Sequence, residues 1–339
     1  MENRSNSITR ATIKDVSRLA EVSIKTVSRV LNNEKYVTEQ TKVRVEQAMA
    51  QLGFQPSFAA RALAGHRSHQ IAVICDNPNP WYVYEVLIGS RTRCQRENIR
   101  IIAQPYDRDS PNFLADMVSL VDQIHPDGII LTPPGCDDIH VLNELARRKV
   151  PIVRVQPGIF PELTSSVQID NTQAAYEMTR HLLDLGHKRI GFIVGDRAYS
   201  VSERRLNGYA RALAEAGQQL EVELVQQGTF EFGSGAHAAE ILLAGANPPT
   251  AIFASNDEMA AGVLAKAHRL GVGVPQQLSV AGFDDAPVAQ LVWPSLTTVR
   301  QPVRLLAEEA AGLLVTNPGG SEDRKIAYEL VIRESTARI

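Results

Sequence analysis

Residues 12–32 read TIKDVSRLAEVSIKTVSRVLN, and this stretch predicts two short helices joined by a tight turn. Thr12 and Asp15 have the spacing of an N-cap residue and its capping-box acid, so the first helix begins directly after Thr12. Residues 20–22 form the turn, and Ser23 caps the second helix. The first helix has an apolar stripe at helical spacing, which consists of Ile13, Val16, Leu19 and Ala20.

The second helix, residues 24–31, has two different faces. Its inward face is apolar and consists of Val27, Val30 and Leu31. Its outward face is basic and hydroxylated and consists of Ile24, Lys25, Ser28 and Arg29. A third helix begins after the cap Thr38 and ends at Leu52, where Gly53 stops it. The major groove of B-DNA admits a helix like the second one, and the alternative interpretation is an ordinary surface helix.

The net charge of −3 conceals an asymmetry along the chain. Residues 1–68 contain 11 Lys and Arg against 6 Asp and Glu, whereas residues 69–339 contain 24 against 32. This asymmetry is typical of a protein whose basic N-terminal part, the head, binds a polyanion. The acidic remainder, the body, is repelled by the same polyanion. A charged, solvated face is the other interpretation of this asymmetry.

Together with residues 37–65, VTEQTKVRVEQAMAQLGFQPSFAARALAG, the opening stretch resembles the N-terminal module of the lac repressor (LacI/GalR) family of bacterial transcription regulators. In that family the second helix reads the major groove of double-stranded operator DNA. The resemblance implies base-reading roles for Ile24, Lys25 and Arg29. It implies contacts to the phosphate backbone from Ser23, Thr26, Ser28 and Asn32, which fix the register on DNA.

Residues 56–65, PSFAARALAG, are rich in helix formers but too short and too polar for a stable helix alone, so a linker is one interpretation. The resemblance implies a hinge helix that enters the minor groove at the operator centre. Leu63 matches the wedge that opens a base step there, and Ala60 lies one turn before it. Ser57 stands where relatives often have Asn.

From residue 69 onward, apolar β-branched runs alternate with helix-length segments, which predicts parallel sheets covered on both faces. The runs are residues 70–75, 99–104, 128–132, 151–155, 189–194, 250–255 and 278–283. The predicted helices include residues 111–124, 171–186, 202–216 and 256–271.

The resemblance continues through GHKRIGFIVG, RRLNGY, FASNDEMAAG, AGFDD, SLTTVRQP and ELVIRES. It implies a fold with an all-α helix-turn-helix head and an α/β body of two Rossmann-like subdomains of the periplasmic-binding-protein kind. We expect a DNA-binding domain at 1–55, a hinge at 56–68 and an effector-binding and dimerisation domain at 69–339. Within that domain the chain crosses between subdomains near residues 166, 295 and 325, so that the first subdomain spans about 69–165 and 296–325 and the second about 166–295 and 326–339.

Open α/β sheets bind ligands beyond the carboxyl ends of their strands, so two facing subdomains predict a cleft between them. The resemblance implies a small-molecule effector there, a sugar or sugar derivative, with ligating residues Arg205, Asn256 and Asp284 and a packing aromatic, Phe230. The positions of the loops add Asp76, Trp81, Tyr82 and Thr132. We expect Asp257 and Asp285 to cap helices or brace their loop, and Trp293 to pack at a crossing.

Arg154 leaves a question open about the effector. It ends a predicted strand, and beside Arg205 in the cleft it would favour a carboxylated or phosphorylated ligand. The alternative is a surface residue paired with an acid.

Other functional classes lack their motifs. No G-x-G-x-x-G follows the first strand, and neither GxxxxGK[ST] nor G-x-S-x-G nor H-E-x-x-H occurs, so we expect no enzyme activity, metal or cofactor. The chain has no apolar run of membrane-spanning length, and MENRSNSITRATIKD has no signal-peptide core. Three widely spaced cysteines predict buried thiols of a cytoplasmic protein: Cys75, Cys94 and Cys136.

Palindromic operators demand a two-fold partner, so we expect a homodimer whose contacts involve residues 82–97 and 111–124. Tetrameric relatives carry a leucine-heptad helix after the last strand, which this sequence does not show. The sequence leaves open whether the effector releases DNA or strengthens its binding.

Overall fold

The computed structural model describes residues 11–31, 36–54, 67–107 and 110–339. The chain divides into two compact units, residues 1–68 and 69–339, and each is described here by itself. The predictions for Asn32, Ala60 and Leu63, like the rest of the hinge segment 56–65, lie outside the described residues.

The described residues of the first unit form three helices, α1 (Ile13–Leu19), α2 (Ile24–Leu31) and α3 (Glu39–Leu52), and their predicted caps are confirmed. The backbone N–H of Thr12 donates to Asp15 Oδ2 over 2.9 Å, which closes the capping box of α1. Side chains also accept at the other two N-termini, where Thr26 N donates to Ser23 Oγ (3.1 Å) and Thr41 N to Thr38 Oγ1 (3.4 Å).

A small apolar core joins these three helices, made of Val16, Ala20, Val27, Val45 and Ala48. Leu19 does not belong to it, because 43% of its surface is exposed. Our expectation that Leu19 completes the buried stripe of α1 is therefore wrong. Val16 and Ala20, one turn apart, already fill the face of α1 toward α2 and α3, and Val22 packs on the same core from the turn.

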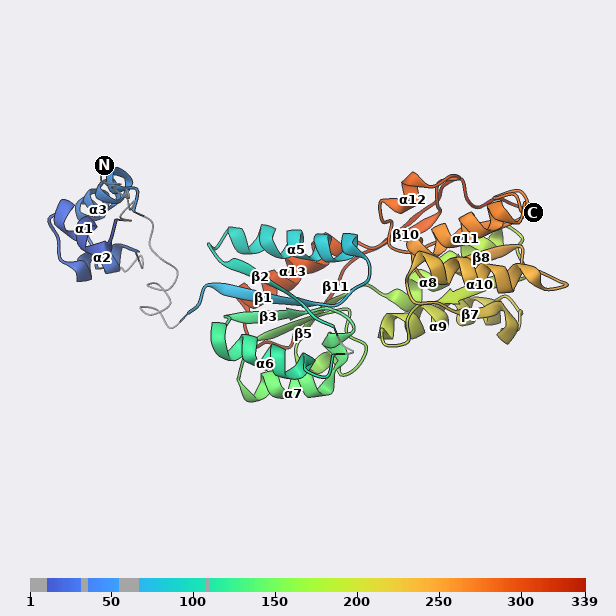
Figure 1. Ribbon diagram of the computed structural model, residues 1–339, viewed down its shortest axis with the longest axis horizontal. Coiled ribbons are helices and arrows are strands. Elements are labelled where there is room, and N and C mark those ends of the chain that lie inside the picture. The colour runs from blue at the N-terminus through green and yellow to red at the C-terminus, as the bar shows by residue number, and fades with distance from the viewer. Residues whose placement is uncertain (1–10, 32–35, 55–66, 108–109) are drawn as a thin grey trace, which may run out of the picture. The chain divides into compact units, whose positions relative to one another are not determined.

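The second unit begins with a six-stranded parallel sheet in the order β11-β5-β4-β3-β1-β2. Its strands are β1 (Gln70–Cys75), β2 (Arg100–Pro105), β3 (Gly128–Leu131), β4 (Ile152–Val155), β5 (Ser165–Gln168) and β11 (Asp323–Lys325). Four helices cover it, α5 (Pro80–Gln95) and α13 (Val303–Thr316) on one face, and α6 (Phe113–Ile124) and α7 (Ile139–Arg147) on the other (Figure 1). The strand residues alternate between these faces, so that Val73 packs toward α5 and Ile74 toward α6.

A second parallel sheet has the order β7-β6-β8-β9. Its strands are β6 (Ile190–Val194), β7 (Val225–Gln227), β8 (Ala251–Ala254) and β9 (Ser279–Ala281). Helices α8 (Asn171–Asp184) and α9 (Ser200–Glu215) pack on one face, and α10 (Phe232–Ala244) and α11 (Asp257–Arg269) on the other. The remaining elements are α12 (Val288–Leu291), the antiparallel pair β10 (Thr298–Arg300) and β12 (Glu329–Val331), and short 3-10 turns η1 (Gly135–Asp137), η2 (Pro161–Leu163) and η3 (Val222–Leu224).

The chain passes between the two sheets three times, after β5, after β10 and after β11. The first two passages lie a few residues beyond the expected positions near 166 and 295, because β5 pairs within the first sheet and β10 bridges to the loop after β9. We call residues 69–168 and 302–325 the first half of the body, and residues 169–300 and 326–339 the second half. Gln301 lies in the second passage.

Trp293 is 83% exposed, so our expectation that it packs at a crossing is wrong. The buried position in this segment belongs to Leu296, whose backbone N–H donates to Ala289 O over 2.8 Å. No helix among the described residues combines the length and the apolar character that a membrane crossing needs.

Gly208→Ala is expected to destabilise the body, because α8 and α9 cross closely at this glycine. A Cβ atom on Gly208 would lie 2.1 Å from the backbone oxygen of Thr172, so the helices must separate, at a cost of about 1–3 kcal/mol. Urea unfolding of the full chain measures the effect. Asn207→Ala, at an exposed position on the same helix, is the control. Equal midpoints for the two variants would contradict the close crossing.

Candidate ligand cleft and nucleic-acid interface

The outward face of α2 is the candidate nucleic-acid interface. Ile24 is 45% exposed, and Lys25 and Ser23 are exposed beside it. Thr26, Ser28 and Arg29 are half-buried, whereas Val27 points into the core. The hydroxyls of Ser23 and Thr26 lie 2.9 Å apart and bond to each other at the start of the helix. The helix N-terminus therefore presents hydroxyls, and the exposed face presents an apolar and a basic side chain.

A cleft opens between the two halves of the body, at the carboxyl ends of their strands. It encloses about 450 Å³ of empty space, including the part open to solvent. Its lining consists of Asn77, Asn79, Tyr82, Pro133, Gln156, Tyr199, Val201, Arg205, Phe230, Asn256, Asp284 and Gln301. The lining mixes aromatic rings with hydrogen-bonding groups, which is the combination found in small-molecule sites.

The structure brings five of the eight sequence-predicted cleft residues together in this lining: Tyr82, Arg205, Phe230, Asn256 and Asp284. The other three, Asp76, Trp81 and Thr132, do not line it. Thr132 is fully buried and donates to Ile74 O over 3.3 Å. Trp81 packs against the core of the first half, and the Asp76 backbone carbonyl accepts a bond from Tyr199. Position at a strand end thus did not determine which way these side chains point.

Seven lining residues were missed by sequence reasoning. Asn77, Asn79, Pro133, Tyr199 and Val201 follow strands whose loops were already singled out, so the loops were identified but not the side chains within them. Gln156 follows β4, and its place after a strand of the first sheet was an available signal. Gln301 lies in a passage between the halves, where no sequence pattern marks a ligand-facing residue.

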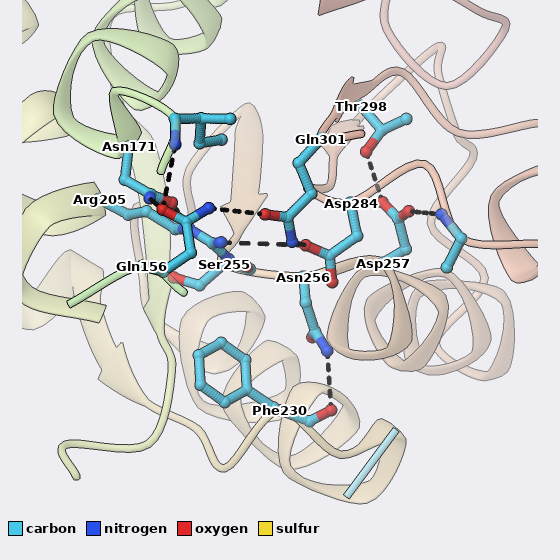
Figure 2. A network of polar contacts seen from close by, with 12 residues as sticks. Gln156, Asn171, Arg205, Phe230, Ser255, Asn256, Asp257, Asp284, Thr298 and Gln301 are labelled. Carbon is cyan, nitrogen blue, oxygen red and sulfur yellow. Dashed lines mark hydrogen bonds and ion pairs between the residues drawn. The ribbon is translucent and has the colours of Figure 1, made fainter. Parts of the chain in front are cut away.

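Arg205, on α9, is the only cation in the lining, and it is nearly fully buried. Its Nε donates to Asn171 Oδ1 over 3.0 Å and its Nη1 donates to the backbone oxygen of Ser255 (Figure 2). Its guanidinium also lies 3.6 Å above the ring of Phe283. The third nitrogen, Nη2, is 3.9 Å from Asp284 Oδ1. Burial lowers the pKa of Arg205 to about 10, which leaves it charged at neutral pH.

Asp284 faces Arg205 and is the only acid in the lining. Gln301 Nε2 donates to its Oδ1 over 2.6 Å. Burial raises the pKa of Asp284 to about 7, although Arg205 and Gln301 both act to lower it. The Asp284 backbone has φ +113°, so the chain turns sharply there to aim this carboxylate at the cleft.

A chain of amides links Asp284 back to Arg205. Gln301 Oε1 accepts from Gln156 Nε2 over 3.3 Å, and Gln156 Oε1 accepts from Asn171 Nδ2 over 3.0 Å (Figure 2). Asn171 in turn receives Arg205, so five side chains from both halves form one closed polar ring. We call it the cleft ring; it consists of Arg205, Asn171, Gln156, Gln301 and Asp284. Its polar groups therefore hold one another in place before any ligand binds.

Three further acidic or amide residues hold the second half's loops. Asn256 caps α11 by accepting from Met259 N over 3.0 Å and donates to Phe230 O over 2.9 Å. Asp257 is fully buried and accepts from Ala286 N (2.8 Å) and the Thr298 hydroxyl (2.6 Å); burial raises its pKa. Asp285 pairs with Arg300 and Arg333, so bracing roles for Asp257 and Asp285 are confirmed.

Arg154 is fully buried and belongs to neither of the alternatives we considered. It donates to the Thr164 hydroxyl and to three backbone carbonyls, those of Cys136, Ile159 and Phe160. It therefore ties down loops of the first half, away from the cleft lining. The idea of a second guanidinium that would select an acidic ligand is not supported.

In the part of the chain that the structure describes, no three His, Cys, Asp or Glu side chains lie close enough together to hold a metal ion. The three cysteines are free thiols and all buried, as expected.

Comparisons with known proteins identify families and relatives that resemble this chain. A family described as "Bacterial regulatory proteins, lacI family" matches residues 12–57, and one described as "Periplasmic binding protein-like domain" matches residues 179–336. The HTH-type transcriptional regulator DegA of Bacillus subtilis is 33% identical over 335 residues, 97% of this chain and 98% of DegA. The HTH-type transcriptional repressor PurR of Photobacterium profundum is 33% identical over 333 residues, 96% of this chain and 98% of PurR.

Two solved structures are similar over nearly the full chain. The lac repressor dimer bound to operator and the anti-inducer ONPF has a TM-score of 0.83 at 25% identity, covering 97% of this chain and 100% of that one. The complex of the transcriptional regulator CelR with cellobiose has a TM-score of 0.74 at 29% identity, covering 96% and 100%. The helix-turn-helix head, the two-sheet α/β body and these full-length similarities agree, and the chain belongs to the lacI family of bacterial regulatory proteins.

Proposed function

We propose that this protein is a homodimeric repressor that binds a palindromic operator and responds to a sugar or sugar derivative in the cleft. The observation that carries the effector part is the cleft ring, which joins the two halves of the body through charged and amide groups, four of which line the cleft. The DNA part rests on the exposed face of α2 and on membership of the family.

On DNA, α2 lies in the major groove, where Ile24, Lys25 and Arg29 read base edges. The hydroxyls at and near the helix start, those of Ser23, Thr26 and Ser28, hold the phosphate backbone. Asn32 adds a further phosphate contact, and Ala60 and Leu63 enter the minor groove from the hinge; these three roles follow from the family resemblance.

A neutral ligand with adjacent hydroxyls suits the cleft. Arg205 Nη2 offers a donor 3.9 Å from the acceptor on Asp284, a separation at which one ligand hydroxyl accepts from Arg205 while its neighbour donates to Asp284. Arg205 already faces Asp284 and is the only cation in the lining, so a phosphate finds no further cation there. Tyr82 and Phe230 supply aromatic faces for the C–H surface of a sugar ring. CelR, whose structure contains cellobiose, is a relative that binds such a compound.

The dimer and its response follow from the same design. We place the two-fold contacts on α5 and α6, within the expected residues 82–97 and 111–124. An effector that prefers one orientation of the two halves changes the spacing of the two hinges on DNA. It shifts operator affinity by its differential affinity for the two orientations, and operator shifts effector affinity equally. The cleft is proposed as a sensor with no catalytic step.

Arg29→Ala is expected to relax base preference at one operator position and to weaken specific binding by about 1–3 kcal/mol, because a guanidinium recognises guanine through two bonds. Competition binding against a library of single-base operator variants measures both effects. Arg44→Ala is the control, since it removes the same charge from an exposed position on α3. Base preference that stays unchanged in Arg29→Ala would remove Arg29 from the reading set.

Selection of bound fragments from genomic DNA, with the purified full-length protein, tests the proposed function as a whole. An enriched inverted repeat is the expected result, and the genes beside it indicate which sugars to assay. Uniform, salt-sensitive binding with no enriched site, both without and with candidate sugars, would refute the proposal.

A further inference from the structure

Tyr199 makes a contact across the mouth of the cleft. It is the residue that precedes α9 in the second half, and its hydroxyl donates to the backbone oxygen of Asp76 over 2.9 Å. Asp76 follows β1 in the first half. Tyr199 is 4% exposed although it lines the cleft, so its ring is enclosed by both halves.

The position of this contact in the sheets sets it apart from the other bonds between the halves. The chain leaves the first half at β5 and at β11, which are neighbours at one edge of the six-stranded sheet. β1 lies three strands from β5, which at about 4.8 Å per strand is roughly 14 Å away. The Tyr199 contact is therefore away from these two passages. The remaining passage, at Gln301, enters α13 beside the start of α5, where Arg304 bonds to Glu85 over 2.8 Å.

Hydrogen bonds that lie beside a passage hold the halves where the chain already connects them. Arg204, also on α9, donates to Pro157 O over 2.6 Å and to Gln168 Oε1 over 3.0 Å. Gln168 is the last residue of β5, directly before the first passage, so this contact lies close to the axis about which the halves would turn. A rotation about that side moves the Tyr199 hydroxyl farther from its acceptor than it moves Arg204.

The ring of Tyr199 is held by groups that face the ligand space. Its edge packs on Phe230, with ring centroids 5.3 Å apart and an interplanar angle of 81°. Phe230 O accepts from Asn256, and Gly195 leaves the room that the Phe230 ring occupies, because a Cβ there would lie 2.1 Å from Phe230 Cζ. A ligand that displaces Phe230 therefore moves Tyr199 as well.

The loop after β1, which contains Asp76, makes a second and longer contact with the second half. Asn79 Nδ2 donates to Glu258 Oε1 on α11 over 3.5 Å. The loop after β1 is thus fastened to the second half at both of its ends, residues 76 and 79.

We propose that Tyr199 is the latch of the cleft: its bond to the Asp76 carbonyl holds the two halves together at the mouth, and the halves separate when it breaks. The inference rests on the proposed function only in taking the cleft as the effector's entrance. Tyr199 acts as a positioning residue, through the orientation of the halves.

Tyr199→Phe tests the latch, because it removes one hydroxyl and keeps the ring on Phe230. Spin labels on Ala146→Cys in α7 and Ala214→Cys in α9, both exposed, report the distance between the halves by double electron–electron resonance. The native cysteines are buried, so the labels are selective, and dilution with unlabelled chain restricts the signal to distances within one chain. The full-length protein is used without any added sugar.

Tyr209→Phe is the matched control, since the Tyr209 hydroxyl donates to the Ile190 carbonyl over 2.7 Å entirely within the second half. Both variants lose one bond from a tyrosine hydroxyl to a backbone oxygen. We expect a second, longer distance population in Tyr199→Phe and none in Tyr209→Phe. Glu258→Ala is also expected to add a population at longer distances, but a smaller one than in Tyr199→Phe.

Two results would overturn the latch: a Tyr199→Phe distribution identical to the wild type, or an equal lengthening in Tyr209→Phe, which would mark general loosening. Operator selection by the unlabelled wild-type protein is measured separately. Its failure would remove the proposed function and leave the distance result standing, so the two inferences fail independently.

Discussion

Replacing Arg205 by methionine is expected to abolish the response of operator binding to effector, while the protein still binds its operator. The variant removes the only cation of the cleft lining, opens the cleft ring at Asn171 and Asp284, and loses the bond to the Ser255 carbonyl. Effector coupling in such proteins corresponds to about 5–150-fold in affinity, and the whole factor should be lost. Operator titrations with and without the sugar found by screening neutral mono- and disaccharides on the wild type measure it.

Arg211→Met is the control for this prediction. Arg211 lies on the same helix and stacks on an aromatic ring in the same manner, 4.1 Å above Tyr176, but outside the cleft lining. It should keep the wild-type response. A normal response in Arg205→Met would place the effector elsewhere on the molecule. Urea unfolding of both variants separates a loss of response from a loss of folded protein.

Arg154→Met should produce the largest loss of stability, about 3 kcal/mol or more. Three backbone carbonyls and one hydroxyl bond to this buried guanidinium, and each buried acceptor left without a donor costs about 1–3 kcal/mol. Methionine fills much of the volume and supplies no donor. Chemical unfolding of the full chain gives the free-energy difference.

Arg147→Met provides the comparison, because Arg147 is exposed and pairs only with Glu144 among the contacts described. Exposed ion pairs contribute about 0–1 kcal/mol, so its unfolding midpoint should stay near the wild type. If Arg154→Met shifted stability no more than Arg147→Met, the loops around Ile159 would have to be held by other contacts.

The sequence predicted most of the secondary structure because its signals are local. The caps Thr12, Ser23 and Thr38 marked helix starts correctly. The hydroxyls of Ser23 and Thr38 accept from the backbone N–H three residues onward, whereas the hydroxyl and the backbone N–H of Thr12 both donate to Asp15. Apolar runs located β1 to β4, β6, β8 and β9 for the same reason, whereas the short polar strands β5, β7 and β11 have no such run and were missed. Leu19 shows the limit of periodicity, because helical spacing defines a face but not how much of that face a small core covers.

The cleft was harder to predict than the fold. Family motifs led to Arg205, Asn256 and Asp284, which all line it. Loop position alone selected four residues, of which Tyr82 lines the cleft and Asp76, Trp81 and Thr132 do not. The direction of a loop side chain depends on backbone angles that no residue pattern shows. The role of Arg154 depends on how the loop after its own strand folds back to present the carbonyls of Ile159 and Phe160 beside that of Cys136, which no residue pattern shows.

The discontinuous build of the first half has a consequence for how the protein is made. Helix α13 packs beside α5 and over β3, β4 and β5, and it supplies Leu306, Ala310 and Leu313 to their shared core. These residues emerge from the ribosome some two hundred positions after α5. At a synthesis rate of about 5–20 residues per second, roughly 10–40 s pass between the synthesis of α5 and that of α13. During this time α13 does not cover the apolar face of α5. The core of the first half is therefore incomplete until α13 has been made, and the body completes its folding only when synthesis is nearly over.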